Sequence, residues 1–454
     1  MVLLDVMFVA IYVLFPIALW FAMKLSGNPL TNLSVPNFVV IALLILAYSG
    51  YFTLYFGLDE YRVQIGVRDK YTLLKSALFT VYSIMTFVLG IFLCAKAVGT
   101  KSFSPSNLNN IQLINRGETL WLFFLLVVVA AVLAIYVSKI PKLALLVAIT
   151  DSVSEAKVVR SDMGNNFSGK YHWYSLFMHT ISSFVSFSLL SAWLISKRKL
   201  LGALSFISFC VSSFSMIMAT QKGPFVWFIL GMFFTFVLTK QNGRLSIIKL
   251  VPIAVIGLGA LLLADITFMG SSGVGSALSS VFSRAFSGGI TPSYFYLEYF
   301  PKHQDYLLGR SFPNPGGLLP YEPFHLTVEV ADWVFPHMVK TGIVSTMPAV
   351  FWGESYANFG LVGILFFPFI IGFFISLMVF FFNKLRTSPV TIGMTVWMML
   401  HYKQLASTGI SGFIIDRRLY ILLLLVIVIL ATSNRLKLFL NLSSRKVVDQ
   451  ELSV

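Results

Sequence analysis

Apolar runs of about 20 residues recur along most of the chain and limit the folds open to it. A helix needs roughly 20 apolar residues to cross the hydrocarbon core of a bilayer. The runs cover residues 4–23, 35–56, 71–95, 120–137, 173–195, 200–218, 224–239, 248–264, 356–382, 390–413 and 419–432. The chain is also only 11% charged, whereas soluble domains are about 25% charged. We therefore predict an all-α polytopic membrane protein with about 11 transmembrane helices.

The distribution of basic residues predicts the orientation of these spans. Every second connection is short and basic, and these clusters are 197–199, then Lys240, Arg244 and Lys249, then Lys384 and Arg386, then Arg435, Lys437, Arg445 and Lys446. Placing them in the cytoplasm puts the C-terminus inside and the N-terminus outside. The first run is expected to be a retained span, because no basic region precedes it and no small-residue cleavage site follows it.

This topology divides the chain into four parts. Residues 1–267 are predicted to form an N-terminal bundle of about eight spans, and residues 268–355 a large outer loop. About three C-terminal spans follow over 356–433, and residues 434–454 form a cytoplasmic tail.

The connections that this topology places outside are also rich in Lys and Arg, which is the disfavoured side for such residues. They contain Arg62, Arg68, Lys70, Arg160, Lys170, Lys222, Arg284, Lys302, Arg310, Arg417 and Arg418. Two interpretations stay open: ordinary solvated loops, or a cationic surface at the membrane boundary that binds a phosphorylated ligand. The net charge of +15 does not indicate nucleic-acid binding, because no aromatic-basic motif of that kind accompanies it.

The outer segment 268–355 carries structural signals despite its lack of a span. Residues 271–287 predict a short amphipathic helix that holds Arg284, and residues 293–300 predict an aromatic segment on the bilayer surface. Residues 308–320 (LGRSFPNPGGLLP) contain too much Gly and Pro for regular helix. A loop of this length is usually a functional lid or a binding loop.

Two residues at the predicted outer boundary are candidates for function. Residues 345–360 (STMPAVFWGESYANFG) begin as a broken turn and then enter a span, with Glu354 at its mouth. An acid there is costly unless it is paired or hydrated, although a helix N-terminus also favours one. Lys222 lies in a short outer turn just before Pro224, where free backbone N–H groups of a helix start add anion affinity. A snorkelling lysine in a tight turn is the alternative.

Ionisable residues also fall inside the run 390–413. They are His401 and Lys403, with the polar Gln404 beside them, and at helical spacing His401, Gln404 and Thr408 are expected to share one face. Such residues usually face a cavity or a partner helix, and interhelical hydrogen bonding is the simpler alternative.

The sequence carries no Walker loop, G-x-G-x-x-G or G-x-S-x-G motif, which argues against ATP-driven transport, dinucleotide chemistry and hydrolase-fold acyl transfer. His303, His325 and His337 lie in the outer segment without metal-ligand spacing. We therefore predict no structural metal site.

The arrangement of about eleven spans with one large outer loop late in the chain resembles the bacterial O-antigen polymerases, or oligosaccharide repeat-unit polymerases. The local matches are residues 308–320, residues 345–348 (STMP) and residues 353–360 (GESYANFG). Residues 220–223 (TQKG) are similar to the short Ser/Thr-x-Arg-Gly turn of these enzymes and of the related ligases, with Lys222 where Arg is usual. A lysine supplies a point charge instead of a bidentate fork.

The resemblance implies an inner-membrane glycosyltransferase with a GT-C-like fold and a large periplasmic loop that contains short helices. Its substrates would be undecaprenyl-pyrophosphate-linked oligosaccharides, and a growing glycan would move onto a new lipid-linked unit at the periplasmic face. It implies no cofactor, since the glycosyl-pyrophosphate bond is already activated. Partners would be membrane lipid and a chain-length regulator protein, with no nucleic acid.

Candidate residues fit this chemistry by type. A lipid pyrophosphate leaving group is stabilised by cations, for which we name Lys222, Arg284 and Arg310, with Arg417 or Arg418 as a second clamp. Attack by a sugar hydroxyl benefits from a general base, for which Glu354 comes first, then His337 and Asp332. Aromatic side chains that can stack on sugars are Tyr294, Tyr296, Tyr321, Trp333 and Tyr356, and membrane-interface anchoring is the alternative.

Two other functions stay open. An O-antigen ligase would move the finished glycan to the lipid A core and is expected to use a histidine in the large loop. A flippase or exporter of lipid-linked oligosaccharides would need a charged cavity through the membrane, which His401 and Lys403 favour. The lack of an internal repeat argues against the exporter.

Overall fold

The computed structural model describes residues 2–100, 102–105, 108, 111–150, 153–164, 167, 169–245, 255, 257–259, 262, 266, 273–340, 344–414 and 416–433. Helix is the only extended secondary structure in these residues, which confirms the all-α prediction. Eight helices are long and apolar enough to cross a membrane. They are Leu3–Leu25, Val35–Tyr55, Lys70–Ala97, Arg116–Ser138, Tyr171–Ser196, Lys199–Ile217, Lys222–Lys240 and Phe351–Phe382. All eight coincide with predicted runs.

Within the described residues, the remaining three predicted runs form no further helix that is long and apolar enough to count as a span. The run 248–264 lies for the most part outside the described residues. The run 390–413 is broken, because α19 (Pro389–Tyr402) ends at Tyr402 and continues only as the 3-10 turn η6 (Lys403–Ala406). The prediction that His401, Gln404 and Thr408 share one helical face is therefore wrong. The last run forms a helix over 417–433.

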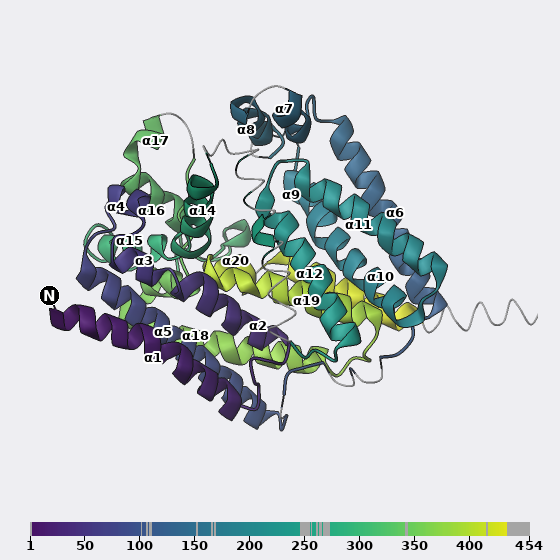
Figure 1. The fold of residues 1–454 in the computed structure, drawn as a ribbon, viewed down its shortest axis with the longest axis horizontal. Helices are drawn as coiled ribbons and strands as arrows, with labels where there is room; N and C mark the ends of the chain where they lie inside the picture. Colours follow the sequence, from purple (N-terminus) through teal and green to yellow (C-terminus); the bar gives the residue numbers. More distant parts are fainter. Residues whose placement is uncertain are drawn as a thin grey trace, which may run out of the picture. The chain divides into compact units, whose positions relative to one another are not determined.

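The chain folds into two compact units, each assembled from separate parts of the sequence (Figure 1). Unit 1 contains Met1–Ser104, Gly275–Phe382 and His401–Asp416. Unit 2 contains Pro105–Val274, Asn383–Leu400 and Arg417–Val454. The division of the sequence into four consecutive parts, predicted above, describes membrane topology and not compact units. It stays a prediction.

The central contact of unit 1 joins α5 (Lys70–Ala97) to α18 (Phe351–Phe382), with α1 (Val2–Leu25) on the other side of α5 (Figure 1). Glycines allow α5 and α18 to approach closely, as is common between membrane helices. A Cβ atom added at Gly90 would lie 2.3 Å from the Phe369 carbonyl oxygen, and one at Gly372 would lie 2.2 Å from that of Phe87. Side chains larger than hydrogen at these two positions would force the helices apart.

Polar contacts bring several helix ends to one end of unit 1. The second span comprises α2 (Val35–Ala42), the π-helical turn η1 (Leu43–Tyr48) and α3 (Tyr51–Tyr55). Asp5, near the start of α1, accepts hydrogen bonds from the Tyr55 hydroxyl and the Lys70 ammonium, each at 2.9 Å. Thr72, at the start of α5, donates to Glu298 of α15 (Thr291–Tyr299) at 2.9 Å. The start of α1 and the large predicted loop therefore share one end of this unit.

The segment 273–340 forms short helices around that end. The expected amphipathic helix is present as α14 (Val274–Phe282), which continues as the π-helical turn η4 (Ser283–Ser287). Helices α16 (Leu326–Val334) and α17 (Pro336–Lys340) of this segment are also short. Outside the segment, the short helix α4 (Glu60–Gln64) follows the second span. Residues 308–320 form no α-helix, as predicted, and contain only the 3-10 turn η5 (Pro315–Gly317). The prediction that 293–300 lies on the bilayer surface is wrong, because α15 is buried over most of its length.

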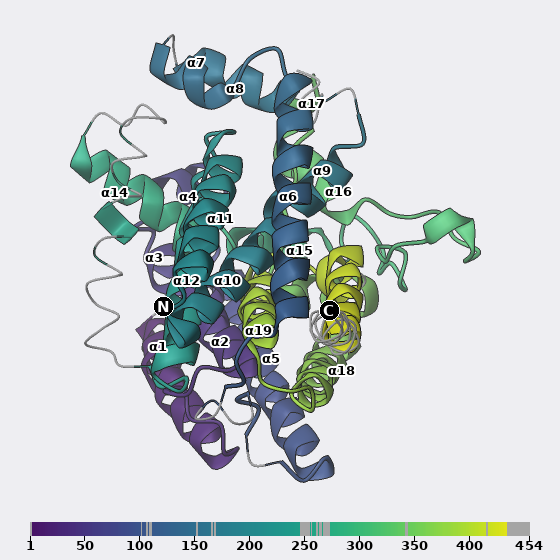
Figure 2. The same ribbon diagram turned by 90° about the vertical axis from the view of Figure 1, so that its right-hand side faces the viewer.

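Unit 2 is a helical bundle around α10 (Ser182–Ser196), which contacts α6 (Arg116–Ser138), α11 (Lys199–Ile217) and α12 (Lys222–Lys240) (Figure 2). The span that ends in α10 begins with α9 (Tyr171–Ser175) and the π-helical turn η3 (Leu176–Ile181). Serines line the contact between α10 and α11, where the hydroxyls of Ser186 and Ser212 lie 2.9 Å apart. The short helices α7 (Ala144–Thr150) and α8 (Val153–Asp162) pack on each other.

Candidate functional site

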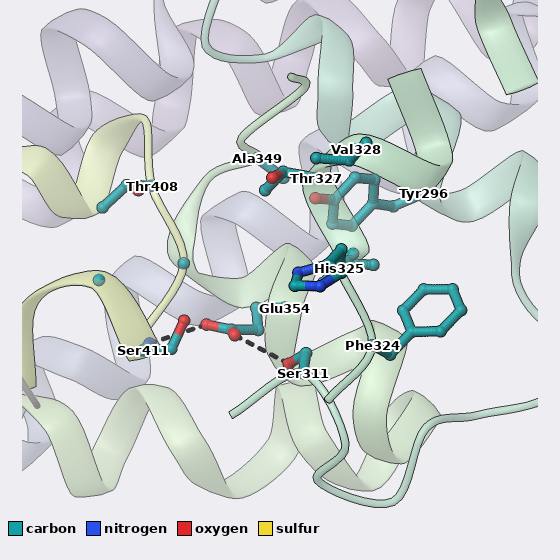
Figure 3. A pocket seen from close by; sticks show the side chains of 13 residues that line it. Tyr296, Ser311, Phe324, His325, Thr327, Val328, Ala349, Glu354, Thr408 and Ser411 are labelled. Atoms are coloured by element: carbon teal, nitrogen blue, oxygen red, sulfur yellow. Dashed lines mark hydrogen bonds between the residues drawn. The ribbon is translucent and has the colours of Figure 1, made fainter. Parts of the chain in front are cut away.

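A cavity of about 210 Å³ in unit 1 surrounds the side chain of Glu354 (Figure 3). We call it the Glu354 pocket. Its lining comes from α15, the loop before α16, the start of α18 and the turn after η6, and comprises Tyr296, Ser311, Phe324, His325, Leu326, Thr327, Val328, Ala349, Glu354, Thr408, Gly409, Ser411 and Gly412. Segments more than 100 residues apart in the sequence thus meet at one carboxylate.

The Glu354 carboxylate is buried and held by two donors from different segments. The residue lies in the first turn of α18 and is only 4% exposed. Its Oε1 accepts a hydrogen bond from the Ser311 hydroxyl at 2.8 Å, and its Oε2 accepts one from the Ser411 backbone N–H at 2.9 Å (Figure 3). No ion pair neutralises it among the described residues. A buried carboxylate with neutral donors and an adjoining cavity is typical of a functional acid or base.

Asn358 fixes the loop that brings Ser311 to Glu354. It lies one helical turn after Glu354, so both side chains occupy the same face of α18. Its Nδ2 donates to the Ser311 hydroxyl at 2.7 Å and to the Glu354 backbone carbonyl at 2.8 Å. Its Oδ1 accepts from the Gly309 backbone N–H at 2.9 Å. The sequence stretches 308–320 and 353–360, singled out separately above, therefore meet in this network.

Gly409 allows the turn after η6 to pass directly over the carboxylate. A Cβ atom added there would lie 2.3 Å from Glu354 Oε2. The position therefore excludes every side chain unless Glu354 moves. The helix break within the predicted span 390–413 therefore contributes to the site, because the turn at 407–410 places the Ser411 N–H within hydrogen-bond distance of Glu354.

His325 is the histidine that the structure brings into the pocket. It precedes α16, and its imidazole points into the cavity beside Glu354 (Figure 3). The residues predicted as alternative bases lie elsewhere. His337 is exposed on α17 against Phe335, and Asp332 on α16 is outside the pocket lining. Nothing in the sequence distinguishes His325 from the other two histidines of the segment.

A second cavity in unit 1, of about 360 Å³, contains two arginines. We call it the arginine pocket, and it is lined by Tyr61, Arg62, Arg284, Gly288, Gly289, Pro292, Phe335, Thr346, Met347, Pro348 and Ser407. Arg62 Nε and Asp59 Oδ2 are buried without a hydrogen-bond partner and form an ion pair with each other at 4.0 Å. Burial lowers the pKa of Arg62 and the positive charge of Arg284 lowers it further, although Asp59 opposes both. The guanidinium stays protonated, so the pocket presents two like charges to any ligand.

Consecutive residues line the two pockets at two places in the chain. Met347 and Pro348 line the arginine pocket and the next residue, Ala349, lines the Glu354 pocket. After η6, Ser407 lines the arginine pocket and the next residue, Thr408, lines the Glu354 pocket. The Tyr296 hydroxyl, in the Glu354 pocket, donates to the Met347 carbonyl at 3.0 Å. The pocket that holds the acid and the pocket that holds the two arginines are therefore lined by neighbouring residues of the same two segments.

The other predicted cations are placed as follows. Arg310 is exposed, and its guanidinium lies 5.8 Å from the ring centre of Phe324, which lines the Glu354 pocket. Lys222, Arg417 and Arg418 belong to unit 2. Lys222 is the first residue of α12, and Arg418 donates to the Ser175 hydroxyl at 3.5 Å. Arg284 and Arg310 are therefore the predicted cations that lie beside Glu354 within its own unit, and Arg62 is added to them.

The predicted sugar-stacking residues divide by burial. Tyr294 and Tyr356 are buried, with the Tyr294 hydroxyl accepting from the Asp69 N–H and the Tyr356 hydroxyl donating to the Phe300 carbonyl. Tyr321 donates to the Phe312 carbonyl at 3.2 Å. Trp333 is exposed and packs against Tyr299 and His303. Of this set, Tyr296 lines the Glu354 pocket.

The predicted intramembrane polar residues lie beside the site and outside its lining. His401 is buried and its Nδ1 lies 3.8 Å from Asp416 Oδ2. Lys403 and Gln404 belong to η6. His401, Lys403 and Gln404 directly precede the turn whose residues Ser407, Thr408 and Gly409 line the two pockets.

No protein-family model, curated protein or solved structure matches this chain. Among the described residues, no group of three or more His, Cys, Asp or Glu side chains is arranged to hold a metal ion. The chemistry of the site is therefore argued from its own residues.

Proposed function

We propose that this protein is an O-antigen polymerase, an inner-membrane glycosyltransferase that joins undecaprenyl-pyrophosphate-linked oligosaccharide repeat units. The observation that carries the proposal is that consecutive residues line the Glu354 pocket and the arginine pocket at two places, Pro348 with Ala349 and Ser407 with Thr408. Transfer from a lipid pyrophosphate needs a base for the acceptor and cations for the leaving group, within the reach of one substrate.

Glu354 acts as the general base. The acceptor sugar hydroxyl attacks the anomeric carbon of the donor glycan, the bond from that carbon to the pyrophosphate oxygen breaks, and the hydroxyl proton passes to Glu354. Ser311 and the Ser411 N–H hold the carboxylate in place before the acceptor arrives. Such preorganisation is what makes a base effective in a partly closed site.

Arg62 and Arg284 bind the pyrophosphate on which negative charge develops. Arg62 suits this role because its buried Nε forms only the 4.0 Å ion pair with Asp59 and no hydrogen bond in the described structure, so a phosphate oxygen would supply the missing hydrogen bond. Arginine presents a planar fork that matches phosphate oxygens. Arg310 lies over Phe324 at the edge of the Glu354 pocket and contributes to the same cationic surface. Lys222 stays a predicted pyrophosphate-binding cation, and Arg417 or Arg418 stays the predicted second clamp.

The proposal includes the finer topology predicted from the sequence. Eleven spans in a GT-C-like arrangement would place the pockets at the periplasmic face and the C-terminus in the cytoplasm. In that count α19 and η6 together cover about 29 Å, since α-helix rises 1.5 Å and 3-10 helix about 2 Å per residue. This length is close to the hydrocarbon thickness of about 30 Å. A chain-length regulator protein is the expected partner.

O-antigen ligase is the second candidate, and His325 is the observation that favours it. The imidazole points into the Glu354 pocket from the large loop, and ligases of this type are expected to use a loop histidine. Donor and leaving group are the same in both reactions, so only the acceptor separates them.

The test of the cationic site uses purified protein in lipid nanodiscs with a lipid-linked repeat unit as the sole substrate. Wild type is expected to release undecaprenyl pyrophosphate and to form a ladder of lipid-linked polymers. Arg284→Gln, at an exposed position, should lower the initial rate by roughly 10- to 100-fold, because a hydrogen bond to a charged group contributes about 1.5–3 kcal/mol. Arg68→Gln is the matched control, since Arg68 is exposed and outside both pockets. Equal rates for Arg284→Gln and Arg68→Gln would contradict the assignment.

A further inference from the structure

The loop 312–321 of unit 1 exposes apolar side chains without any charge. Its sequence is FPNPGGLLPY, and the nearest charged residues are Arg310 before it and Glu322 after it. Leu318 is 83% exposed and Leu319 is 49% exposed. Figure 2 shows this part of the chain projecting away from α15, α16 and α18 of its own unit. Fully burying one leucine stabilises a protein by about 1.5–3 kcal/mol, so a water-exposed pair at a loop tip needs an apolar contact.

The loop is a closed, hydrogen-bonded structure with a fixed tip. Asn314 Nδ2 donates to the carbonyls of Leu319 and Tyr321, each at 2.9 Å, and Asn314 Oδ1 accepts from the Leu319 N–H at 2.9 Å. The Tyr321 hydroxyl donates to the Phe312 carbonyl and closes the base. Gly316 and Gly317 have φ of 71° and 68°, which glycine adopts without strain. The two leucines are therefore presented by the fold itself.

The base of the loop lies beside the outer part of a predicted membrane span. The Phe312 ring is 6.3 Å from the ring of Phe359 and 6.5 Å from that of Phe367, both on α18. The next turns of α18 carry the exposed apolar residues Leu361, Val362, Leu365 and Phe366. The base of the loop therefore lies beside the apolar surface that α18 exposes along its predicted span.

We propose that loop 312–321 inserts its Leu318–Leu319 tip among the acyl chains of the bilayer, at the level where α18 enters the membrane. This contact fixes the height of the Glu354 pocket relative to the lipid surface, because Leu308, Gly309 and Ser311, which precede the loop, are hydrogen-bonded to the start of α18. The proposal concerns membrane contact alone and does not depend on the reaction assigned above.

The test places a spin label at the tip. In a protein with Cys94→Ala and Cys210→Ser, Leu318→Cys is labelled with a nitroxide and reconstituted in nanodiscs of phosphatidylethanolamine and phosphatidylglycerol without substrate. Collision rates are measured with oxygen, which concentrates in lipid, and with the water-soluble complex NiEDDA. Leu365→Cys provides the lipid-facing control and Glu322→Cys the water-facing control, since both positions are exposed.

A label at position 318 should follow the control at 365, with greater oxygen than NiEDDA accessibility, while position 322 shows the reverse. Accessibility at 318 equal to that at 322 would place the tip in water and overturn the proposal. Protection from both reagents would also overturn it, because the tip would then be covered by protein, either a partner or a second copy of the chain.

Discussion

Two buried glutamates, one in each unit, occupy similar positions and have different surroundings. Glu118 lies in the first turn of α6 and Glu354 in the first turn of α18, and they are 0% and 4% exposed. Glu118 forms an ion pair with Arg386 and closes a capping box with Asn115 at the start of α6. Glu354 has no ion pair among the described residues, accepts hydrogen bonds from Ser311 and Ser411, and faces a cavity.

This difference distinguishes a carboxylate that stabilises the fold from one that is available to react with a substrate. A buried charge that is fully paired holds the elements that pair it, and removing one partner leaves the other unsatisfied. A buried carboxylate held only by neutral donors keeps its charge available for a substrate that enters the cavity. By burial alone, Glu118 and Glu354 would be assigned the same role. Their interaction partners, an arginine for Glu118 and neutral donors for Glu354, indicate different roles.

The largest expected effect is on the activity of Glu354→Gln. The substitution should lower the rate of polymer formation by roughly 10²- to 10⁴-fold, the usual contribution of a general base. The amide fits the same donors, because its oxygen can accept from the Ser411 N–H while its nitrogen donates to the Ser311 hydroxyl. The thermal unfolding midpoint should therefore stay close to that of wild type. Glu322→Gln is the control for the lost charge, because Glu322 is exposed and lies outside the Glu354 pocket.

Glu118→Gln should show the opposite pattern. Removing one partner of a buried ion pair typically costs about 3–5 kcal/mol, and we expect the lower end, since the Arg386 side chain is 24% exposed. The unfolding midpoint should fall, whereas the rate per folded molecule should stay unchanged. Adding Arg386→Gln should restore part of the stability. A stable Glu118→Gln protein that has lost activity would break the comparison.

Gly409→Ala should reduce activity through the position of Glu354 alone. The new methyl group would lie 2.3 Å from Oε2 and push the carboxylate out of place. A displacement of about 1 Å can cost roughly 100-fold in rate, so we expect a loss up to that size. Gly275→Ala is the matched control, because nothing lies within 4 Å of its added Cβ atom. Full activity in Gly409→Ala would mean that Glu354 need not be held where the structure has it.

Periodicity and apolar length were sufficient to predict the helical fold, and the long spans matched because each is set by local composition. The break at Tyr402 could not be predicted in the same way. The run 390–413 is apolar enough for a helix, and the turn after η6 is favoured by contacts with residues about 50 positions away, such as the hydrogen bond from Ser411 to Glu354. Long-range contacts of this kind leave no periodic signal.

The candidate site was predicted only in part, because some of its residues also come together through long-range contacts. Glu354 was found because an acid at the mouth of a span is unusual, and Arg284 because a cation on the outer side needs an explanation. Arg62 and His325 were only two among several similar residues, since the α4 turn and the loop before α16 approach the site through tertiary packing. The buried positions of Tyr294 and Tyr356 were missed because aromatic residues at a membrane surface and in a protein core have the same sequence pattern.

The most direct test of the account is a gel of surface lipopolysaccharide from a strain that lacks this gene, complemented either with wild type or with Glu354→Gln. A polymerase that depends on Glu354 should give the full ladder with wild type, and core carrying a single repeat unit with Glu354→Gln and with no complementation. Core without any repeat would instead indicate ligation or export. An intact ladder with Glu354→Gln, at equal protein level, would contradict the central claim that this carboxylate performs the transfer.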